Sequence, residues 1–389
     1  MFQWKRQFLW RRIALAGIAF GLSAGGSLPV SAKPPASEPS TIELVVRASR
    51  TADMYSSLTI ASPSLSARVA QAERIAGERA DDYPDLEVTV RKSSGRKSVY
   101  RLERTGQLWD ETSSSRLRLP ADASDRLLGY AETLRRHHYG KLMTWREARQ
   151  VVTRKSRFTI TDLETGLSFR VQRRAGSSHA DVQPVTKEDS KLMKRIYGGT
   201  WSWERRAIVV TKGGERIAAS MNGMPHGGDG IPGNGFKGHF CVHFLGSTSH
   251  RSDTPDPAHQ LMVYKASGEL RRYFDSASPH ELTTSFVEAM NRKDGDMLRL
   301  LWPEAANERM EALNRLLDRL ESIRIERRRM PLSDEPDDQL SAAVELPVLV
   351  RTKERGAVRA KLRFEVVRSS AGLPWRIVGL TSDHSSLIP

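Results

Sequence analysis

The sequence has 389 residues, a formal net charge of +15 at pH 7 and a hydrophobic content of 39%. This length exceeds what one ordinary hydrophobic core holds, so it predicts a globular chain of two or three domains. The chain contains 1 cysteine, which excludes an intramolecular disulfide and leaves a thiol that is either buried and inert or kept for reactivity.

Residues 1–32 have the three parts of a secretory signal peptide. A basic segment precedes an apolar run at residues 13–22, and Val30, Ser31 and Ala32 form a small-residue cleavage site. The apolar run is short for a permanent membrane span. We therefore predict an exported protein, secreted or associated with the cell envelope, with an uncleaved anchor as the alternative.

The chain that follows this segment is still basic, and the charge predicts its partners. An exported basic protein meets anionic phospholipid and wall polymers before nucleic acid, so we expect wall polymers or a membrane surface and no nucleic acid. The alternative is a basic, solvated surface with no specific ligand.

The folded chain is predicted to begin with a small α+β domain over residues 42–150, after a Pro-, Ser- and Ala-rich linker at residues 33–41. No catalytic pattern occurs in this domain. Its expected elements are strands at residues 42–47, 86–91 and 98–103, a helix around residues 69–76, and a helix from Ser124 to the pair His137 and His138.

A second, mostly β unit is predicted over residues 157–275. Thr186 is expected to cap a helix that extends through Ile196, and Gly213 and Gly214 are expected to form a turn. The expected strands lie at residues 158–162, 167–172, 206–211 and 215–220. The last of these strands leads directly into a glycine-rich loop.

A third unit is predicted over residues 279–389, with helices followed by an antiparallel sheet. The helices are expected at residues 279–291, 296–301 and 307–328, and the strands at residues 342–351, 357–367 and 375–380. Helices followed by a curved sheet with a tryptophan on its final strand resemble the cone-shaped, nuclear-transport-factor-like accessory domains of exported proteins. This resemblance implies a shape and no activity.

Residues 221–260 concentrate the reactive side chains of the chain. They contain the single cysteine, Cys241, and five of the 10 histidines. A thiol becomes a useful nucleophile when a nearby imidazole takes its proton. His226 ends a predicted strand fifteen residues before Cys241. The stretch therefore predicts a catalytic site, and the alternative is that Cys241 is a small core residue.

At this point residues 157–266 resemble the L,D-transpeptidase family, cysteine enzymes that cross-link peptidoglycan. That family carries His-Gly at a strand end, then about fifteen residues, then Ser/Thr-His-Gly-Cys. The matching positions here are His226-Gly227 and Gly238-His239-Phe240-Cys241, followed by Val242-His243.

The resemblance implies a role for each matched residue. Cys241 would be the nucleophile that accepts an acyl group from peptidoglycan stem peptides, His226 its base, and His239 a residue that shapes the site. His243, Gly227 and Phe240 would contact the substrate. This chemistry requires no cofactor and no metal. The overall expectation is an α+β multidomain protein with a central, mostly β, L,D-transpeptidase-like domain.

Two other functions remain open on the sequence. His179, Asp181, His226, His239, His243 and Cys241 are all acceptable zinc ligands, so a zinc-dependent wall peptidase is one alternative. A non-catalytic wall-binding protein is the other. His239, Cys241 and His243 alternate at period 2, so they share one face of a strand in any of these functions.

Further polar residues and two tryptophans surround this pattern. His179 and Asp181 are possible members of the site in either kind of enzyme. A polar segment with two prolines is expected to be a loop. Trp201 and Trp203 are expected to be packing residues, with platforms for glycan binding as the alternative. The polar residues of that loop are His250, Asp253, Asp256 and His259.

Overall fold

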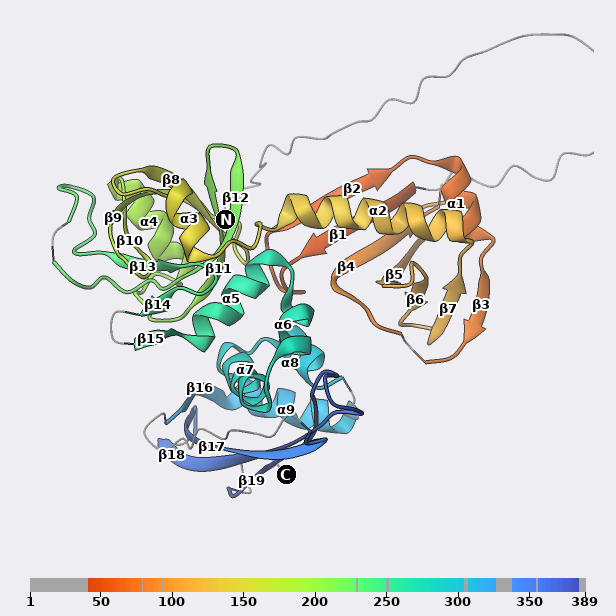
Figure 1. Ribbon diagram of the computed structural model, residues 1–389. Coiled ribbons are helices and arrows are strands. Elements are labelled where there is room, and N and C mark those ends of the chain that lie inside the picture. Colours follow the sequence, from red (N-terminus) through yellow and green to blue (C-terminus); the bar gives the residue numbers. More distant parts are fainter. Residues whose placement is uncertain are drawn as a thin grey trace, which may run out of the picture. The chain divides into compact units, whose positions relative to one another are not determined.

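The computed structural model describes residues 41–384 except 79, 93, 229, 250–251, 304–306, 327–337 and 355. The predicted signal peptide and residues 33–40 of the predicted linker lie outside the described residues. Within them, the chain is an α+β multidomain protein with nine helices and several sheets (Figure 1). No helix of this described part combines the length and the apolar character needed to cross a bilayer.

The first sheet has seven antiparallel strands in the order β2-β1-β4-β5-β6-β7-β3. Helix α2 packs against β1 and β2 through a buried stripe that includes Leu127, Ala131 and Leu134. The elements are β1 (Thr41–Arg47), β2 (Tyr55–Ile60), α1 (Pro63–Ala70), β3 (Glu73–Ala76), β4 (Asp82–Arg91), β5 (Lys97–Glu103), β6 (Leu108–Asp110), β7 (Ser115–Arg118) and α2 (Ala121–His138).

The helix predicted around residues 69–76 is wrong. Helix α1 ends at Ala70, and residues 73–76 pair with β7 as an edge strand instead. The apolar residues Ile75 and Ala76 fit a helical pattern. In the structure the backbone of residues 73–76 forms hydrogen bonds with β7, and the spacing of apolar residues in the sequence does not reveal such a partner. Helix α2 is present, although it begins at Ala121, before the predicted cap Ser124.

The central strands close into a barrel in the order β10-β13-β12-β11-β8-β9. The four predicted strands of this unit are all present, and the turn at Gly213 and Gly214 has φ angles of 59° and 85°. The elements are α3 (Trp145–Val151), β8 (Arg157–Asp162), β9 (Ser168–Ala175), β10 (Ala180–Pro184), α4 (Lys187–Ile196), β11 (Arg206–Lys212), β12 (Glu215–Met221) and β13 (Phe240–His243).

A small hairpin and a run of helices follow the barrel. The elements are β14 (Thr248–Ser249), β15 (Ser252–Pro255), α5 (Pro257–Ser267), α6 (Leu270–Ser276), α7 (Pro279–Arg292), α8 (Gly295–Leu301) and α9 (Asn307–Arg319). The predicted polar loop is therefore wrong at its end, because His259 lies in α5 and is buried. Its residues 250–251 lie outside the described residues.

The last sheet is antiparallel, with the order β16-β17-β18-β19. The strands are β16 (Leu320–Ile325), β17 (Ser341–Thr352), β18 (Ala357–Val367) and β19 (Arg376–Ser382). The predicted helix 307–328 is wrong beyond Arg319, because residues 320–325 pair with β17. The three predicted strands are present, and Phe364 of β18 contacts Phe286 of α7 at a ring distance of 5.5 Å.

Candidate active site

Strand β13 presents its side chains to two different environments. Phe240 and Val242 belong to the buried apolar cluster of the barrel, whereas Cys241 and His243 alternate with them. This confirms the alternation that the sequence predicts. In the barrel, β13 lies between β12 and β10, so residues from both neighbouring strands can meet the thiol.

The loop after β12 returns to β13 and places His226 at Cys241. His226 and His239 exchange two backbone hydrogen bonds, of 3.0 Å and 2.8 Å. The Sγ atom of Cys241 then lies 3.3 Å from Nε2 of His226. Nδ1 of His226 lies 2.8 Å from the carbonyl oxygen of Met224, which can only accept, so Nδ1 carries a proton. Nε2 is thereby left as the acceptor for the thiol proton.

Two glycines make this close approach possible. Gly227 has a φ of +72°, and a Cβ atom there would lie 2.4 Å from Cε1 of His239. Gly238 has a φ of +89°, and a Cβ atom there would lie 2.3 Å from the carbonyl oxygen of His226. Both positions therefore require glycine for the His226 and His239 rings to meet. The hydroxyl residue that the resembled family carries at the position of Gly238 does not fit this backbone.

His179 and Asp181 join the site from β10. Asp181 lies opposite Cys241 in the register of β10 and β13. Nε2 of His179 lies 3.1 Å from Oδ1 of Asp181, and Nδ1 lies 2.8 Å from the carbonyl oxygen of Thr248. Both side chains are buried, with His179 exposed by 1% and Asp181 by 4%. The structure therefore brings together the two residues that the sequence marked as possible members.

A stack of imidazole rings extends from the site into the interior. The His179 and His243 rings are 4.5 Å apart, and the His243 and His259 rings are 3.7 Å apart. His259 Nδ1 lies 2.9 Å from the hydroxyl of Ser220. Sequence reasoning missed this stack, because it assigned His259 to a loop.

Two predicted substrate contacts do not fit their positions. His243 is 2% exposed and lies between two other rings, and Phe240 is fully buried in the barrel core. Neither side chain offers a surface to a bound molecule. Burial also holds the pKa of His243 well below its ordinary value, with the neighbouring histidines adding to the effect.

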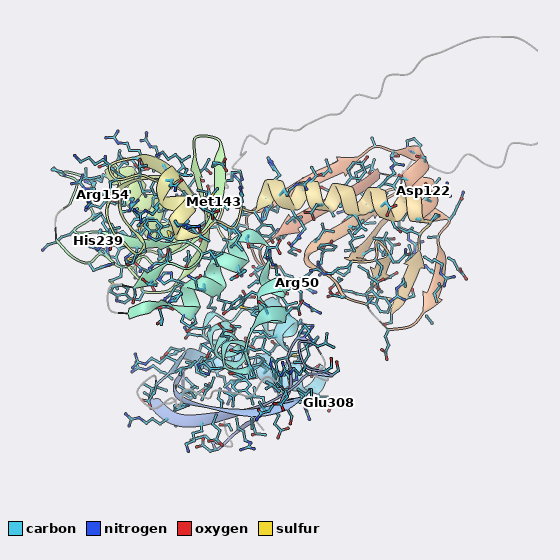
Figure 2. All side chains as sticks on the ribbon, viewed as in Figure 1. Arg50, Asp122, Met143, Arg154, His239 and Glu308 are labelled. Atoms are coloured by element: carbon cyan, nitrogen blue, oxygen red, sulfur yellow. The ribbon has the colours of Figure 1, made fainter. Side chains whose placement is uncertain are left out.

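The accessible part of the site is formed by other aromatic rings. His239, which lies among the barrel elements in Figure 2, is half-buried, and its ring is 4.5 Å from that of His226. Trp203 is 51% exposed and lies 5.0 Å from the His226 ring. Trp203 therefore packs only in part, against His226, and leaves half of its surface exposed. Trp201 does pack, edge-on against Phe236 at 5.1 Å.

The local electrostatics favour an ionised thiol. Burial acts to raise the pKa of Cys241, but hydrogen bonds with His179 and His226 outweigh it and hold that pKa below its ordinary value. The hydrogen bond to Cys241 raises the pKa of His226, against a smaller opposing effect of burial. Cys241 itself is 6% exposed.

Among the residues that the structure describes, two groups of side chains have the atom types and spacing of metal ligands. They are His179, Cys241 and His243, and His226, His239 and Cys241, with the donor atoms of each group within 4.8 Å of one another. However, both ring nitrogens of His179 face oxygen acceptors, and Nε2 of His226 faces the thiol. The nitrogens that a metal would need are thus already paired with Asp181, Thr248 and the thiol.

A scan against models of known protein families gives no match to this chain, and a search of curated proteins gives none either. What bears on function is therefore the geometry of Cys241 and its neighbours.

Proposed function

We propose that this protein is an exported cysteine acyltransferase acting on peptidoglycan stem peptides, in the manner of L,D-transpeptidases. The observation that carries the proposal is the 3.3 Å contact between Cys241 Sγ and Nε2 of His226, whose Nδ1 is held by the carbonyl oxygen of Met224. A nucleophile, its base and a group that orients the base are the three parts that covalent acyl transfer needs.

The proposed reaction proceeds in two steps. Nε2 of His226 takes the thiol proton, and Sγ of Cys241 attacks a peptide carbonyl carbon to form a C–S bond. The C–N bond then breaks, and the leaving amine takes the proton from His226. In the second step an amine or water gives a proton to His226 and attacks the thioester carbon. The C–S bond then breaks, and His226 returns the proton to Sγ of Cys241.

The substrate class has support of a different kind. The order of strand, His226-Gly227, loop and His239-Phe240-Cys241 resembles the family that acts on peptidoglycan. Cleavage after residue 32 removes four basic residues and no acidic one, so the formal net charge falls from +15 to about +11, which still suits a protein that works beside anionic wall polymers or a membrane surface. The signal-like residues 1–32 would bring the chain to that compartment.

The test is intact-mass analysis of the purified protein after incubation with a carbapenem, which acylates thiols as a mimic of the wall peptide. We expect one covalent adduct that maps to Cys241. It should be absent in Cys241→Ala, slowed by two orders of magnitude or more (about 10²–10⁴-fold) in His226→Gln, and unchanged in the exposed control His137→Gln.

Metal content is measured on the same sample. No adduct together with about one zinc per chain would replace this proposal with a zinc peptidase. No adduct and no zinc would replace it with a wall-binding protein. An adduct that persists in Cys241→Ala would place the nucleophile elsewhere.

A further inference from the structure

Cys241 has a second imidazole neighbour that the proposed proton transfer does not use. A ring nitrogen of His179 lies within 4.8 Å of Cys241 Sγ. Asp181, the ion-pair partner of His179, lies directly opposite Cys241 on the neighbouring strand. Residues directly opposite each other in an antiparallel pair project to the same face of the sheet. The thiol therefore shares its face with an imidazole and a carboxylate.

Oxygen atoms lie close to both ring nitrogens of His179. Nδ1 lies 2.8 Å from the carbonyl oxygen of Thr248, which has no proton to donate. Nε2 lies 3.1 Å from a carboxylate oxygen of Asp181. Each nitrogen thus has an oxygen acceptor at close range, although Nδ1 also lies 3.3 Å from the Ser178 hydroxyl, and this arrangement favours a proton on both nitrogens, as in an imidazolium cation.

The surroundings keep this cation charged. Burial acts to lower the pKa of His179, but its hydrogen bonds to Asp181 and Cys241 outweigh burial and raise it to about 10. His179 is 1% exposed, so bulk water does not screen its charge from the thiol. A buried imidazolium beside a thiol favours the thiolate form.

His226 has the opposite character. It is half-buried, has one ring nitrogen fixed by a carbonyl and the other facing the thiol, and lies against the exposed Trp203. One proton can therefore pass on and off its Nε2, at the accessible part of the site. The two imidazoles are thus suited to two different tasks.

We infer that His179, held by Asp181 and Thr248, is a second catalytic imidazole that stabilises the Cys241 thiolate as a fixed cation, while His226 alone moves protons. The inference rests on the proposed role of Cys241 as a nucleophile. As the C–S bond forms, negative charge moves from Sγ to the carbonyl oxygen. The leaving amine takes its proton from His226, and His179 keeps both of its protons throughout.

The first test measures the rate of Cys241 alkylation by iodoacetamide against pH. Only the thiolate reacts, so the midpoint of the profile reports the thiol pKa and the plateau reports access. We expect His179→Gln to move the midpoint upward by about one pH unit or more, which lowers the rate well below the midpoint about tenfold. At high pH the alkylation rate of His179→Gln should stay within about twofold of the rate of the unaltered protein, because the thiolate then forms without His179.

The matched control is His259→Gln, which removes another buried ring of the same stack that lies beyond His243. We expect it to lower the melting temperature and leave the alkylation midpoint in place. An unmoved midpoint in His179→Gln, or an equal shift in both variants, would overturn the inference.

The second test needs no variant, so it holds even if His179→Gln does not fold. Nitrogen NMR of the unaltered protein labelled at histidine reports the proton on each ring nitrogen. We expect one imidazole, assigned to His179 through its contact with Thr248, to keep both protons at pH 8 while His226 titrates. A neutral His179 ring at pH 7 would overturn the inference.

These tests are separable from that of the proposed function. A low alkylation midpoint that depends on His179 supports the inference whether or not a carbapenem adduct forms. If a carbapenem adduct forms on Cys241 and the alkylation midpoint of His179→Gln equals that of the unaltered protein, the inference is overturned and the acyltransferase proposal stands.

Discussion

At the scale of residues, two different parts of the backbone bring side chains to Cys241: the loop between β12 and β13, and the pairing of β10 with β13. His226 and His239 are brought together by backbone hydrogen bonds within one continuous stretch. Asp181 arrives through the pairing of β10 with β13, and His179 immediately precedes β10. The first part depends on glycines that let the chain turn back. The second depends on closure of the barrel. A change to either part should therefore disturb the thiol in a different way.

Gly227 offers a direct test of the first part, the loop. Its φ is +72°, and the Cβ atom of an alanine there would lie only 2.4 Å from His239 Cε1, so Gly227→Ala must move the His239 ring or the loop. We expect a loss of about 1–3 kcal/mol in the free energy of unfolding and slower acylation of Cys241. The measurements are urea unfolding and intact mass after carbapenem treatment.

The neighbouring Gly228 is the matched control. A Cβ atom there meets nothing within 4 Å, so Gly228→Ala should change neither the stability nor the acylation by much. If the two alanine variants behave alike, the space at Gly227 does not control the site.

The part of the site that could be predicted from the sequence is the part made by local chain. The spacing of His226, Gly227 and Cys241 and the alternation along β13 are visible as patterns, and the structure places Cys241 beside His226. The ion pair of His179 with Asp181 could be named only as a possibility. Its position depends on which strand pairs with β13, and no local pattern encodes a pairing partner so far along the chain.

At the scale of elements, the sequence predicts the positions of strands that are bounded by clear turns. It does not predict elements whose conformation depends on pairing with a strand far away in the sequence. β11 and β12 alternate on either side of a two-glycine turn, and β17 and β18 are long, alternating runs. In contrast, β16 continues directly from α9 without a break in the apolar pattern, so its residues fitted a longer helix. Its pairing with β17 decides the outcome.

The sequence before helix α5 contains residues typical of a helix start, although the polar composition of the segment led to the prediction of a loop. Asp256 is its N-cap and accepts hydrogen bonds from the backbone N–H groups of Ala258 and His259, and Pro257 occupies the first turn. An Asp-Pro pair before an apolar run is typical of a helix start. This helix also carries His259 to the ring stack.

The cap can be tested by two substitutions. Asp256→Ala removes the acceptor and should cost about 0.5–2 kcal/mol in the free energy of unfolding. Asp256→Asn keeps an acceptor for the cap and loses only the charge that faces Arg205 at 2.7 Å, so it should cost less. Chemical denaturation measures both. Equal losses in the two variants would show that the ion pair, and not the cap, is what matters.

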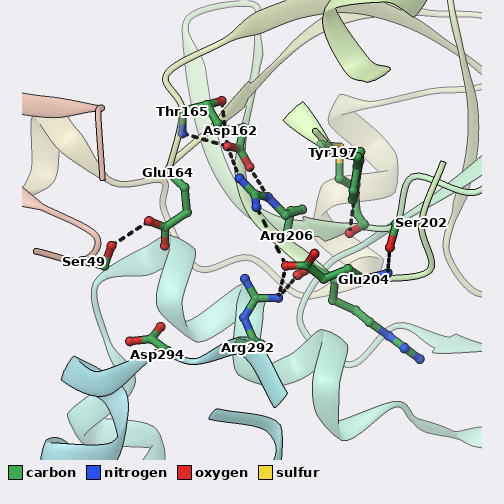
Figure 3. A network of polar contacts seen from close by, with 12 residues as sticks. Ser49, Asp162, Glu164, Thr165, Tyr197, Ser202, Glu204, Arg206, Arg292 and Asp294 are labelled. Carbon is green, nitrogen blue, oxygen red and sulfur yellow. Dashed lines mark hydrogen bonds and ion pairs between the residues drawn. The ribbon is translucent and has the colours of Figure 1, made fainter. Parts of the chain in front are cut away.

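At the scale of the whole chain, an ion network around the buried Lys265 connects residues that are far apart in the sequence. Lys265 of α5 is 3% exposed and lies 2.7 Å from Glu164 and 2.5 Å from Asp294. Ser49 donates a hydrogen bond of 2.6 Å to the other oxygen of Glu164 (Figure 3). Burial acts to raise the pKa values of Glu164 and Asp294, but attraction to Lys265 outweighs it and lowers both. The two carboxylates are therefore ionised in the folded protein because Lys265 is there.

The variant Lys265→Met tests how much this cation contributes to the free energy of unfolding. The substitution leaves two largely buried carboxylates without their cation, and because Glu164 keeps 20% of its side chain exposed we expect a cost at the lower end of the range of about 3–5 kcal/mol that is typical of a broken buried pair near neutral pH. The lowered pKa values mean that the network stabilises the unaltered protein above the unfolded carboxyl pKa of about 4, and that this stabilisation is lost as the pH falls through the folded values.

In Lys265→Met the same carboxylates are relieved of their charge when they take up protons. The difference in melting temperature between the two proteins should therefore be largest near pH 7 and shrink as the pH falls toward 4. Thermal unfolding across that range measures it, with the exposed Lys191→Met as a control that should change little. A difference that stays constant with pH would mean that Lys265 contributes through packing of its aliphatic chain and not through its charge, because burial of an apolar stem does not depend on protonation.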